Sequence, residues 1–213
     1  MTSRLPSLLT TVDFSEAELC ALVLDGVLFR VGEGFSAVDE IPGVALRARS
    51  LATWLPAQLV AERRTAAWVW GARNDAPAVH ELCVDIAVRA RPVAAMRLTV
   101  REVVITPDEV AHFDGGDVRV SVTTPVRTAV DIARTSRQFA GQDAECVAML
   151  MALGQFGAEH CVAAMDERRN LPGKKRAVER LRRSERIAAS LPRVEEPLAV
   201  DPLAVQIASG DRV

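Results

Sequence analysis

VRVSVTTPVRTAVDIAR, residues 118–134, joins a strand pattern to a helix pattern with almost no loop between them. Apolar and polar residues alternate from Val118 to Val122, which is the period of a strand with one buried face. Thr124 offers a side-chain oxygen to cap a helix, and Pro125 suits the first turn, where no amide hydrogen is needed. The sequence therefore predicts a strand–helix joint at the core of the fold. One apolar helix face follows from Val126, Ala129, Val130 and Ala133.

Two charged residues of this helix, Arg127 and Asp131, form an i, i+4 pair. The cation lies N-terminal to the anion, which is the poorer orientation against the helix dipole, so each has reason to find a partner elsewhere in the fold. The favoured alternative is an architectural arginine and a solvated aspartate, because structural ion pairs outnumber functional ones. Thr124, Pro125, Arg127 and Asp131 are accordingly taken as structural residues of the motif.

The composition is that of a soluble globular chain, with 213 residues, 49% hydrophobic and 25% charged. No apolar run approaches the roughly 20 residues of a membrane helix, and residues 1–11 lack the features of a signal peptide. We therefore expect a cytoplasmic protein without a membrane partner. The four cysteines form no CxxC pair, which favours reduced, buried thiols over a zinc site or disulfides. They are Cys20, Cys83, Cys146 and Cys161.

The N-terminal segment reads as a helix ending at Asp25–Gly26, followed by a hairpin that turns at residues 32–34. Helix, glycine and hairpin together resemble the third helix and wing of a winged helix. Too few residues precede them for the usual first two helices, and Glu16, Glu18 and Asp25 would repel a phosphate backbone. We expect a truncated winged-helix-like unit with little contact to duplex DNA.

The middle of the chain predicts helices over 44–59 and 60–71, broken near Pro56. Trp68 and Trp70 are interpreted as packed core rather than as a ligand-stacking platform, because each aromatic ring buries a large area. Arg63 and Arg64 are interpreted as a solvated edge rather than an anion site. A strand over 80–93, one or two strands over 97–106, and a hairpin over 110–122 that turns at Gly115–Gly116 together favour an antiparallel sheet.

The predicted fold class is α+β, with a small antiparallel sheet packed by helices and a C-terminal helical segment. Helices are expected over 143–153, 158–168 and 170–191, the last opened by Pro172. The expected domains are a winged-helix-like remnant over 1–45 and an α+β domain over 46–191. Residues 192–213 have little periodicity and are expected to form a flexible tail.

Charge is strongly segregated along a chain whose total is −2. Residues 1–45 carry two basic and seven acidic residues, whereas residues 167–193 carry ten basic and three acidic residues. Any nucleic acid or acidic partner is therefore expected on the C-terminal helix, although a merely solubilising arginine face remains the alternative. The candidate binding residues are Lys174, Lys175, Arg176, Arg180, Arg182, Arg183 and Arg186.

No pattern of catalytic or metal-ligating residues emerges. His80, His112 and His160 lie far apart and have no partner at ligand spacing. His160 and Cys161 are adjacent on a helix and so point about 100° apart, which prevents direct activation. The only lysines, 174 and 175, lie on the basic helix, away from the strands where a restriction-type nuclease centre needs one. The sequence therefore predicts a protein without catalytic residues, cofactors or a metal.

Four segments in order resemble one protein family. They are the wing-like VLFRVGEGFSAV, then AERRTAAWVWGA, VTTPVRTAVDIAR and NLPGKKRAVERLRR. The last three are similar to the signatures SHRSAAxLWG, TTPxRTxxDLAR and LPGRRGxxxLRR of AbiEi-like antitoxins of type IV toxin–antitoxin systems. The resemblance covers about residues 13–190, and TTPVRTAVDIAR is its most specific part.

Membership would imply an N-terminal winged helix for operator DNA and a C-terminal α+β domain that neutralises a nucleotidyltransferase toxin. This chain differs in its acidic, truncated winged helix and in Arg63, which replaces the histidine of the first signature. The very-short-patch-repair-like endonuclease domain that some relatives carry does not follow. The expected function is an antitoxin-like transcriptional regulator, and the alternative is an interaction module that has lost DNA binding. The sequence leaves the oligomeric state open.

Overall fold

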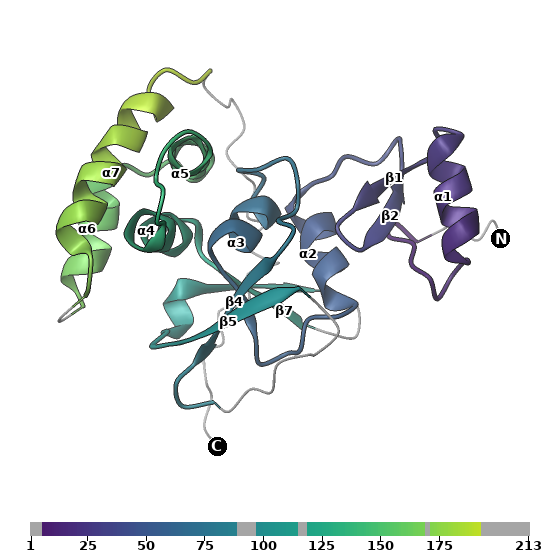
Figure 1. Ribbon diagram of the computed structural model, residues 1–213, viewed down its shortest axis with the longest axis horizontal. Coiled ribbons are helices and arrows are strands. Elements are labelled where there is room, and N and C mark those ends of the chain that lie inside the picture. Colours follow the sequence, from purple (N-terminus) through teal and green to yellow (C-terminus); the bar gives the residue numbers. More distant parts are fainter. Residues whose placement is uncertain (1–5, 89–96, 115–118, 169–170, 193–213) are drawn as a thin grey trace. The chain divides into compact units, whose positions relative to one another are not determined.

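The computed structural model describes residues 6–88, 97–114, 119–168 and 171–192, and the chain divides into two compact units (Figure 1). Unit 1 comprises Met1–Ala57 with Phe113–Val120, and unit 2 comprises Gln58–His112 with Ser121–Val213. The expected tail falls almost wholly in residues 193–213, which lie outside the described residues.

Unit 1 begins with helix α1 (Glu16–Leu24), strands β1 (Leu28–Val31) and β2 (Gly34–Ala37), and helix α2 (Val44–Ala52). Ser15 caps α1 in a capping box with Glu18, and Gly26 has a positive φ of 71° that ends the helix. The strands form an antiparallel hairpin. The predicted helix and hairpin are confirmed, whereas a winged-helix unit is not shown by the described elements.

A small apolar core holds these elements together. Leu9, Leu19, Leu28 and Phe35 are buried against one another, with Leu22 beside them. Leu9 also bridges to Phe35 through two backbone hydrogen bonds, Leu9 N to Phe35 O at 2.7 Å and Phe35 N to Leu9 O at 2.9 Å. The segment before α1 is thereby joined to the hairpin.

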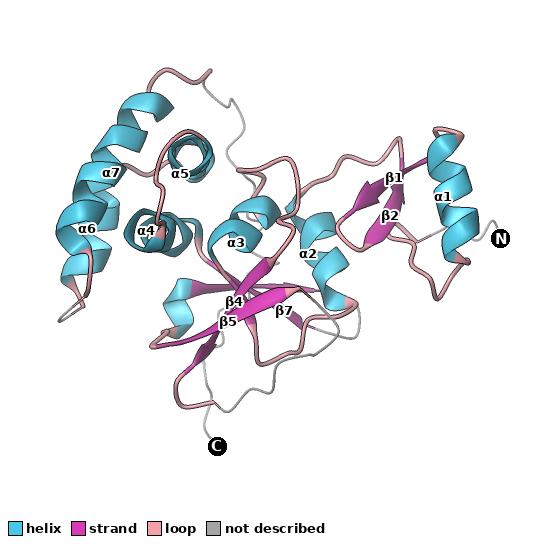
Figure 2. Ribbon diagram, viewed as in Figure 1, coloured by secondary structure: helices cyan, strands magenta, loops and turns pink. Residues whose placement is uncertain are grey.

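The second sheet has the strand order β5-β4-β3-β7-β6. Figure 2 shows the strands in magenta and the helices in cyan. Its strands are β3 (Val60–Ala61), β4 (His80–Asp85), β5 (Leu98–Val103), β6 (Val110–Asp114) and β7 (Arg119–Thr123). β3 pairs antiparallel with β4, but β3–β7 and β4–β5 are parallel pairs. The sheet is therefore mixed.

The prediction of an antiparallel sheet was wrong because spacing in the sequence does not reveal strand direction. His80 lies opposite Leu98 and Asp85 lies opposite Val103, so β4 and β5 run in the same direction. The chain therefore crosses back to the end of the sheet where β4 began before β5 starts. The helix predicted over 60–71 was also too long. Val60 and Ala61 form a two-residue strand that pairs with strands on both sides, and the helix starts only after Glu62.

The helices of unit 2 gather around one central helix, α4 (Pro125–Thr135), which contacts four others (Figure 1). The contacting helices are α3 (Arg63–Val69), α5 (Gln142–Gly154), α6 (Ala158–Asp166) and α7 (Lys174–Ala188). A short 3-10 helix, η1 (Pro107–Glu109), precedes β6. α7 starts two residues after the predicted opening at Pro172, because Gly173 adopts a left-handed φ of 79°.

The core of unit 2 includes Trp68 and Trp70, which confirms that these two tryptophans are packed residues. Val130, Ala129 and Ala133 are buried on α4, as the apolar pattern predicted. Within the described residues, no single helix is long and apolar enough to cross a membrane. α5 and α6 taken together meet the length and composition of a span, with a bend of 94° between them.

Candidate functional site

The strand–helix joint is held by threonines and an indole. Thr124 caps α4 by accepting a hydrogen bond from the backbone of Arg127, and Pro125 occupies the first turn, as predicted. The hydroxyls of Thr123 and Thr128 lie 2.7 Å apart. Trp70 donates from Nε1 to the carbonyl oxygen of Thr123 at 2.8 Å. The joint is therefore a hydrogen-bonded part of the core, and the roles of Thr128 and Trp70 were not visible in the sequence.

Asp131 lies at the centre of a buried charge cluster. Its carboxylate accepts from Arg127 Nε at 2.8 Å and from Arg134 Nη1 at 2.9 Å, and Arg101 Nη2 lies 3.5 Å from Oδ2. Only 1% of its side chain is exposed, so the interpretation of a solvated aspartate was wrong. The reason is tertiary: β5 supplies Arg101, which no helix-based pattern could indicate.

Arg127 is buried between two carboxylates. Its guanidinium, 6% exposed, contacts Asp131 and also donates from Nη1 to Glu109 Oε2 at 2.7 Å. Burial lowers the pKa of Arg127, but the two carboxylates outweigh it and raise that pKa overall. Arg168 contacts the same Glu109 oxygen. The prediction that Arg127 and Asp131 have partners elsewhere is confirmed.

A second buried carboxylate, Glu62, lies at the start of α3. Arg101 donates to it twice, from Nε to Oε1 at 2.7 Å and from Nη2 to Oε2 at 2.5 Å, and Arg63 Nε lies 3.1 Å from Oε1. Glu62 is fully buried. Burial lowers the pKa of Arg101, yet Glu62 and then Asp131 raise it well above its ordinary value. Because Arg101 also reaches Asp131, one guanidinium connects the two buried carboxylates.

The two arginines predicted to form a solvated edge are ion-paired instead. Arg63 pairs with Glu81 at 3.3 Å as well as with Glu62, and it adopts a positive φ of 45°. Arg64 donates hydrogen bonds from Nε and Nη2 to the carboxylate of Asp143 on α5, at 2.9–3.1 Å. Arg63 and Arg64 line a hollow of about 430 Å³. The other lining residues include Ser136 and come partly from α4 and from the segment that follows it. Arg64 and Asp143 are 79 residues apart in the chain, so no spacing pattern in the sequence could reveal their ion pair.

The basic helix α7 places its seven predicted binding residues in different environments. Two of them point back to the C-terminal end of α4. Arg180 Nη1 donates to Ala133 O at 2.8 Å and Ser136 O at 2.9 Å, and its guanidinium lies 4.9 Å from the Phe139 ring centroid. Arg176 donates to Arg134 O at 3.2 Å. These cations satisfy carbonyls that a helix end leaves free.

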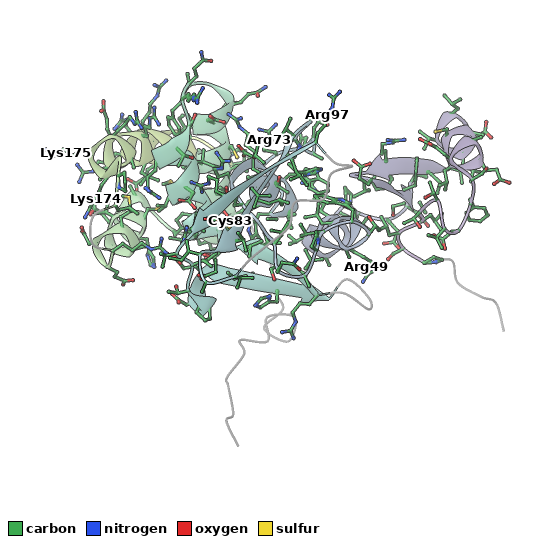
Figure 3. The ribbon with its side chains drawn as sticks, turned by 60° about the horizontal axis from the view of Figure 1, so that its bottom comes forward. Arg49, Arg73, Cys83, Arg97, Lys174 and Lys175 are labelled. Atoms are coloured by element: carbon green, nitrogen blue, oxygen red, sulfur yellow. The ribbon has the colours of Figure 1, made fainter. Side chains whose placement is uncertain are left out.

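The other five candidates lie away from α4. Lys174 pairs with Asp166, and Arg182 pairs with Glu159 at 3.2 Å on the surface. Lys175, Arg183 and Arg186 are exposed and have no ion pair within the described residues. Lys174 and Lys175 mark the N-terminal end of α7 (Figure 3). The helix buries its opposite side through Ala177, Leu181 and Ser184.

The thiols are mostly buried, and two of the imidazoles lie beside hydroxyls: His80 Nδ1 is 3.4 Å from Thr65 Oγ1 and His112 Nδ1 is 3.1 Å from Ser121 Oγ. Cys83, within the sheet in Figure 3, Cys146 and Cys161 are buried, while Cys20 is partly exposed. Burial raises the pKa of Cys146 and of Cys161 to about 12, and it also raises the pKa of Cys83. His80 is buried beside Thr65. Within the described ranges, no three His, Cys, Asp or Glu side chains are grouped to hold a metal ion.

The fold and the charge cluster define a class of protein: an α+β domain built around one buried helix, with arginines rather than nucleophiles at its centre. The family model described as the AbiEi antitoxin C-terminal domain matches residues 43–183, and the chain belongs to that family. Curated proteins give no match.

A similar solved structure is the crystal structure of the RV2827C protein from Mycobacterium tuberculosis, with 16% identity and a TM-score of 0.45. The alignment covers 86% of this chain and 76% of that chain.

Proposed function

We propose that this protein is the antitoxin of a toxin–antitoxin pair, and that it neutralises a nucleotidyltransferase-type toxin by binding it without catalysis. The family match over residues 43–183 carries the proposal, because it covers α2 and nearly every described element of unit 2. The expected site of action is the cytoplasm, where such a toxin would have its substrates.

The charge cluster supports a role without catalysis. A metal-dependent nuclease needs carboxylates that remain open to a metal ion, with a lysine nearby. Here Glu62, Asp131 and Glu109 each bind at least two arginines. Both lysines of the chain lie on α7. The carboxylates therefore serve to hold unit 2 together.

The absence of catalysis is tested with the full chain, supercoiled plasmid DNA, and Mg²⁺ or Mn²⁺. We expect no nicking above the buffer control. Cleavage that disappears in the variant Asp131→Asn, with the variant still folded by circular dichroism, would contradict this part of the proposal.

The antitoxin role is tested by co-expression with a nucleotidyltransferase-type toxin of a type IV toxin–antitoxin pair. We expect the toxin alone to stop growth and the full chain to restore it, with a complex detected by calorimetry. The matched control is Arg64→Met, which removes the ion pair of Arg64 with Asp143 and leaves α7 unchanged. Growth arrest that persists in the presence of folded, soluble full chain would overturn the role.

A second function, binding to operator DNA, is favoured by the exposed cations of α7. Lys175, Arg183 and Arg186 lie free of ion pairs within the described part of the chain, and Arg182 is more than half exposed. α1 carries Glu16 and Glu18 in its first turn, which disfavours contact between that helix and phosphates. The proposed docking surface for DNA or an acidic partner is therefore the exposed side of α7.

The test replaces Lys175, Arg183 and Arg186 by alanine and measures binding to the protein's own promoter at two salt concentrations. Arg180 is left intact because it contacts α4. Contacts to phosphates predict a steep loss of affinity with salt, and the triple variant should lower that slope by about three. If the protein does not bind its promoter but still neutralises the toxin, it is the alternative, an interaction module without DNA binding.

A further inference from the structure

A hollow of about 390 Å³ in unit 2 is lined by four arginines and one carboxylate. Arg101 comes from β5, Arg127 and Arg134 from α4, and Arg168 from the segment after α6. The carboxylate is Asp131, and the apolar part of the wall consists of Val103, Val104 and Leu171. Arginines from three places along the chain thus converge on one opening.

The charges around this hollow do not cancel. Its four guanidiniums are matched by three carboxylates, those of Glu62, Glu109 and Asp131. Three of the arginines meet at Asp131, and Arg127 and Arg168 share Glu109. One positive charge therefore remains without a carboxylate inside a partly dry environment, where it attracts an anion strongly.

Each of the four guanidiniums also keeps a nitrogen with no acceptor among the described residues. These nitrogens are Arg101 Nη1, Arg127 Nη2, Arg134 Nη2 and, for Arg168, both Nη1 and Nε. Unused N–H groups on several convergent guanidiniums suit an oxyanion, because each can donate a charge-assisted hydrogen bond to it.

The electrostatics at Arg134 agree with this geometry. Its pKa is lowered, first by burial and then by the nearby charges of Arg127, Arg101 and Arg168, although Asp131 acts in the opposite direction. Burial is the main cause, and the three neighbouring arginines act in the same direction as burial.

We propose that this hollow binds the phosphate group of a small phosphate ester of the nucleoside phosphate class. Phosphate suits four convergent guanidiniums, and the volume is at the small end of ligand sites. A neighbouring hollow of about 680 Å³ shares Arg127, Arg134, Arg168 and Leu171. It gives room for the sugar and base next to Val126, Val130 and Met165.

This site is independent of toxin neutralisation and of DNA binding by α7. Its residues lie on β5, α4 and the segment after α6, and none belongs to the exposed side of α7. A protein that fails to neutralise a toxin can still bind a phosphate ester here, so the two proposals fail separately.

The test is isothermal calorimetry on the full chain with two probes, inorganic phosphate and adenosine monophosphate, at constant ionic strength. Arg168→Gln removes one of the four guanidiniums and keeps a donor toward Glu109. Val104→Asp adds a negative charge at an exposed position of the wall without altering an arginine. Arg182→Gln is the matched control, because it removes an exposed arginine outside the hollow.

We expect saturable binding by the wild type and by Arg182→Gln, and affinity at least about tenfold weaker in Arg168→Gln and Val104→Asp. Tighter binding of adenosine monophosphate than of inorganic phosphate would show that the organic part is recognised, whereas equal binding would restrict the site to the phosphate group. No saturable binding of either probe, or equal affinity in all four proteins, would overturn the proposal. If Arg168→Gln fails to fold, the affinity of Val104→Asp alone decides the test.

Discussion

Glu62 and Arg101 form two nearly parallel hydrogen bonds, 2.7 and 2.5 Å long, although 39 residues separate them in the chain. Glu62 is fully buried at the start of α3, and Arg101 lies on β5 at the edge of the sheet order. Removing one partner of such a pair leaves a buried charge poorly compensated, whereas removing both does not. The pair therefore connects helix and sheet in a way that mutagenesis can measure.

Arg101→Met should lower the free energy of unfolding by about 3 kcal/mol, because Glu62 would keep only Arg63 as a close cation. Glu62→Leu should be similarly destabilising, since it leaves Arg101 facing Asp131 alone. The double variant should recover part of the loss, which a double-mutant cycle in urea would measure. Strictly additive losses would show that the pair does not act as a unit.

Arg180→Met should lower stability by about 1–2 kcal/mol, because two carbonyls at the end of α4 would lose a charged donor. Arg183→Met is the matched control on the same helix and should change stability by less than about 0.5 kcal/mol. Chemical denaturation of both variants gives the comparison. Equal midpoints for the two would mean that Arg180 contributes no more than a surface arginine.

Val130→Ala should cost about 1–2 kcal/mol, because it removes two methyl groups from a side chain that is 5% exposed on α4. Val126→Ala, on the same helix but less buried, is the control and should cost less. The measurement is the urea midpoint of each variant. A midpoint for Val130→Ala equal to that of the wild type would place this side chain outside the core.

Alkaline pH should destabilise this protein mainly through its buried thiols. Burial raises the pKa of Cys146 and Cys161 to about 12 in the folded state, whereas an unfolded thiol has a pKa near 8.5. The folded state therefore holds more protons in this range, so stability is complete below about pH 8.5 and falls as the pH rises toward 12. The chain has no tyrosine and only two lysines, so few other groups contribute there.

The measurement is the denaturant midpoint between pH 8 and pH 11 for the wild type and for the double variant Cys146→Ala, Cys161→Ala. The double variant should show a flatter decline. Native thiol titration should in parallel modify Cys20 first, because the other three are buried. A decline of equal slope in both proteins would remove these thiols as the cause.

Local patterns predicted much of the fold. The capped α1, the glycine that ends it, the hairpin, and the Thr124–Pro125 start of α4 follow from turn and capping chemistry within a few residues. Strand direction in the second sheet was missed because it depends on where the chain crosses over, which spacing does not encode.

The charge cluster was predicted only in part. Arg127 and Asp131 stand out because they share a helix, but their further partners come from η1 and β5. Glu62 gave no signal at all, since a glutamate beside two arginines usually lies in solvent. Long-range pairing of buried charges decides these positions, and a single sequence does not reveal it.

The hydrogen bonds from Arg176 and Arg180 to the last carbonyls of α4 have a consequence for motion. Detachment of α7 removes these arginine donors from the carbonyls at the C-terminal end of α4. The last turn of α4 should therefore open together with α7. Amide protons in the last turn of α4 and along the buried side of α7 should therefore exchange with solvent deuterium at one common rate. High salt, by weakening the attraction between arginines and carbonyls, should speed both together.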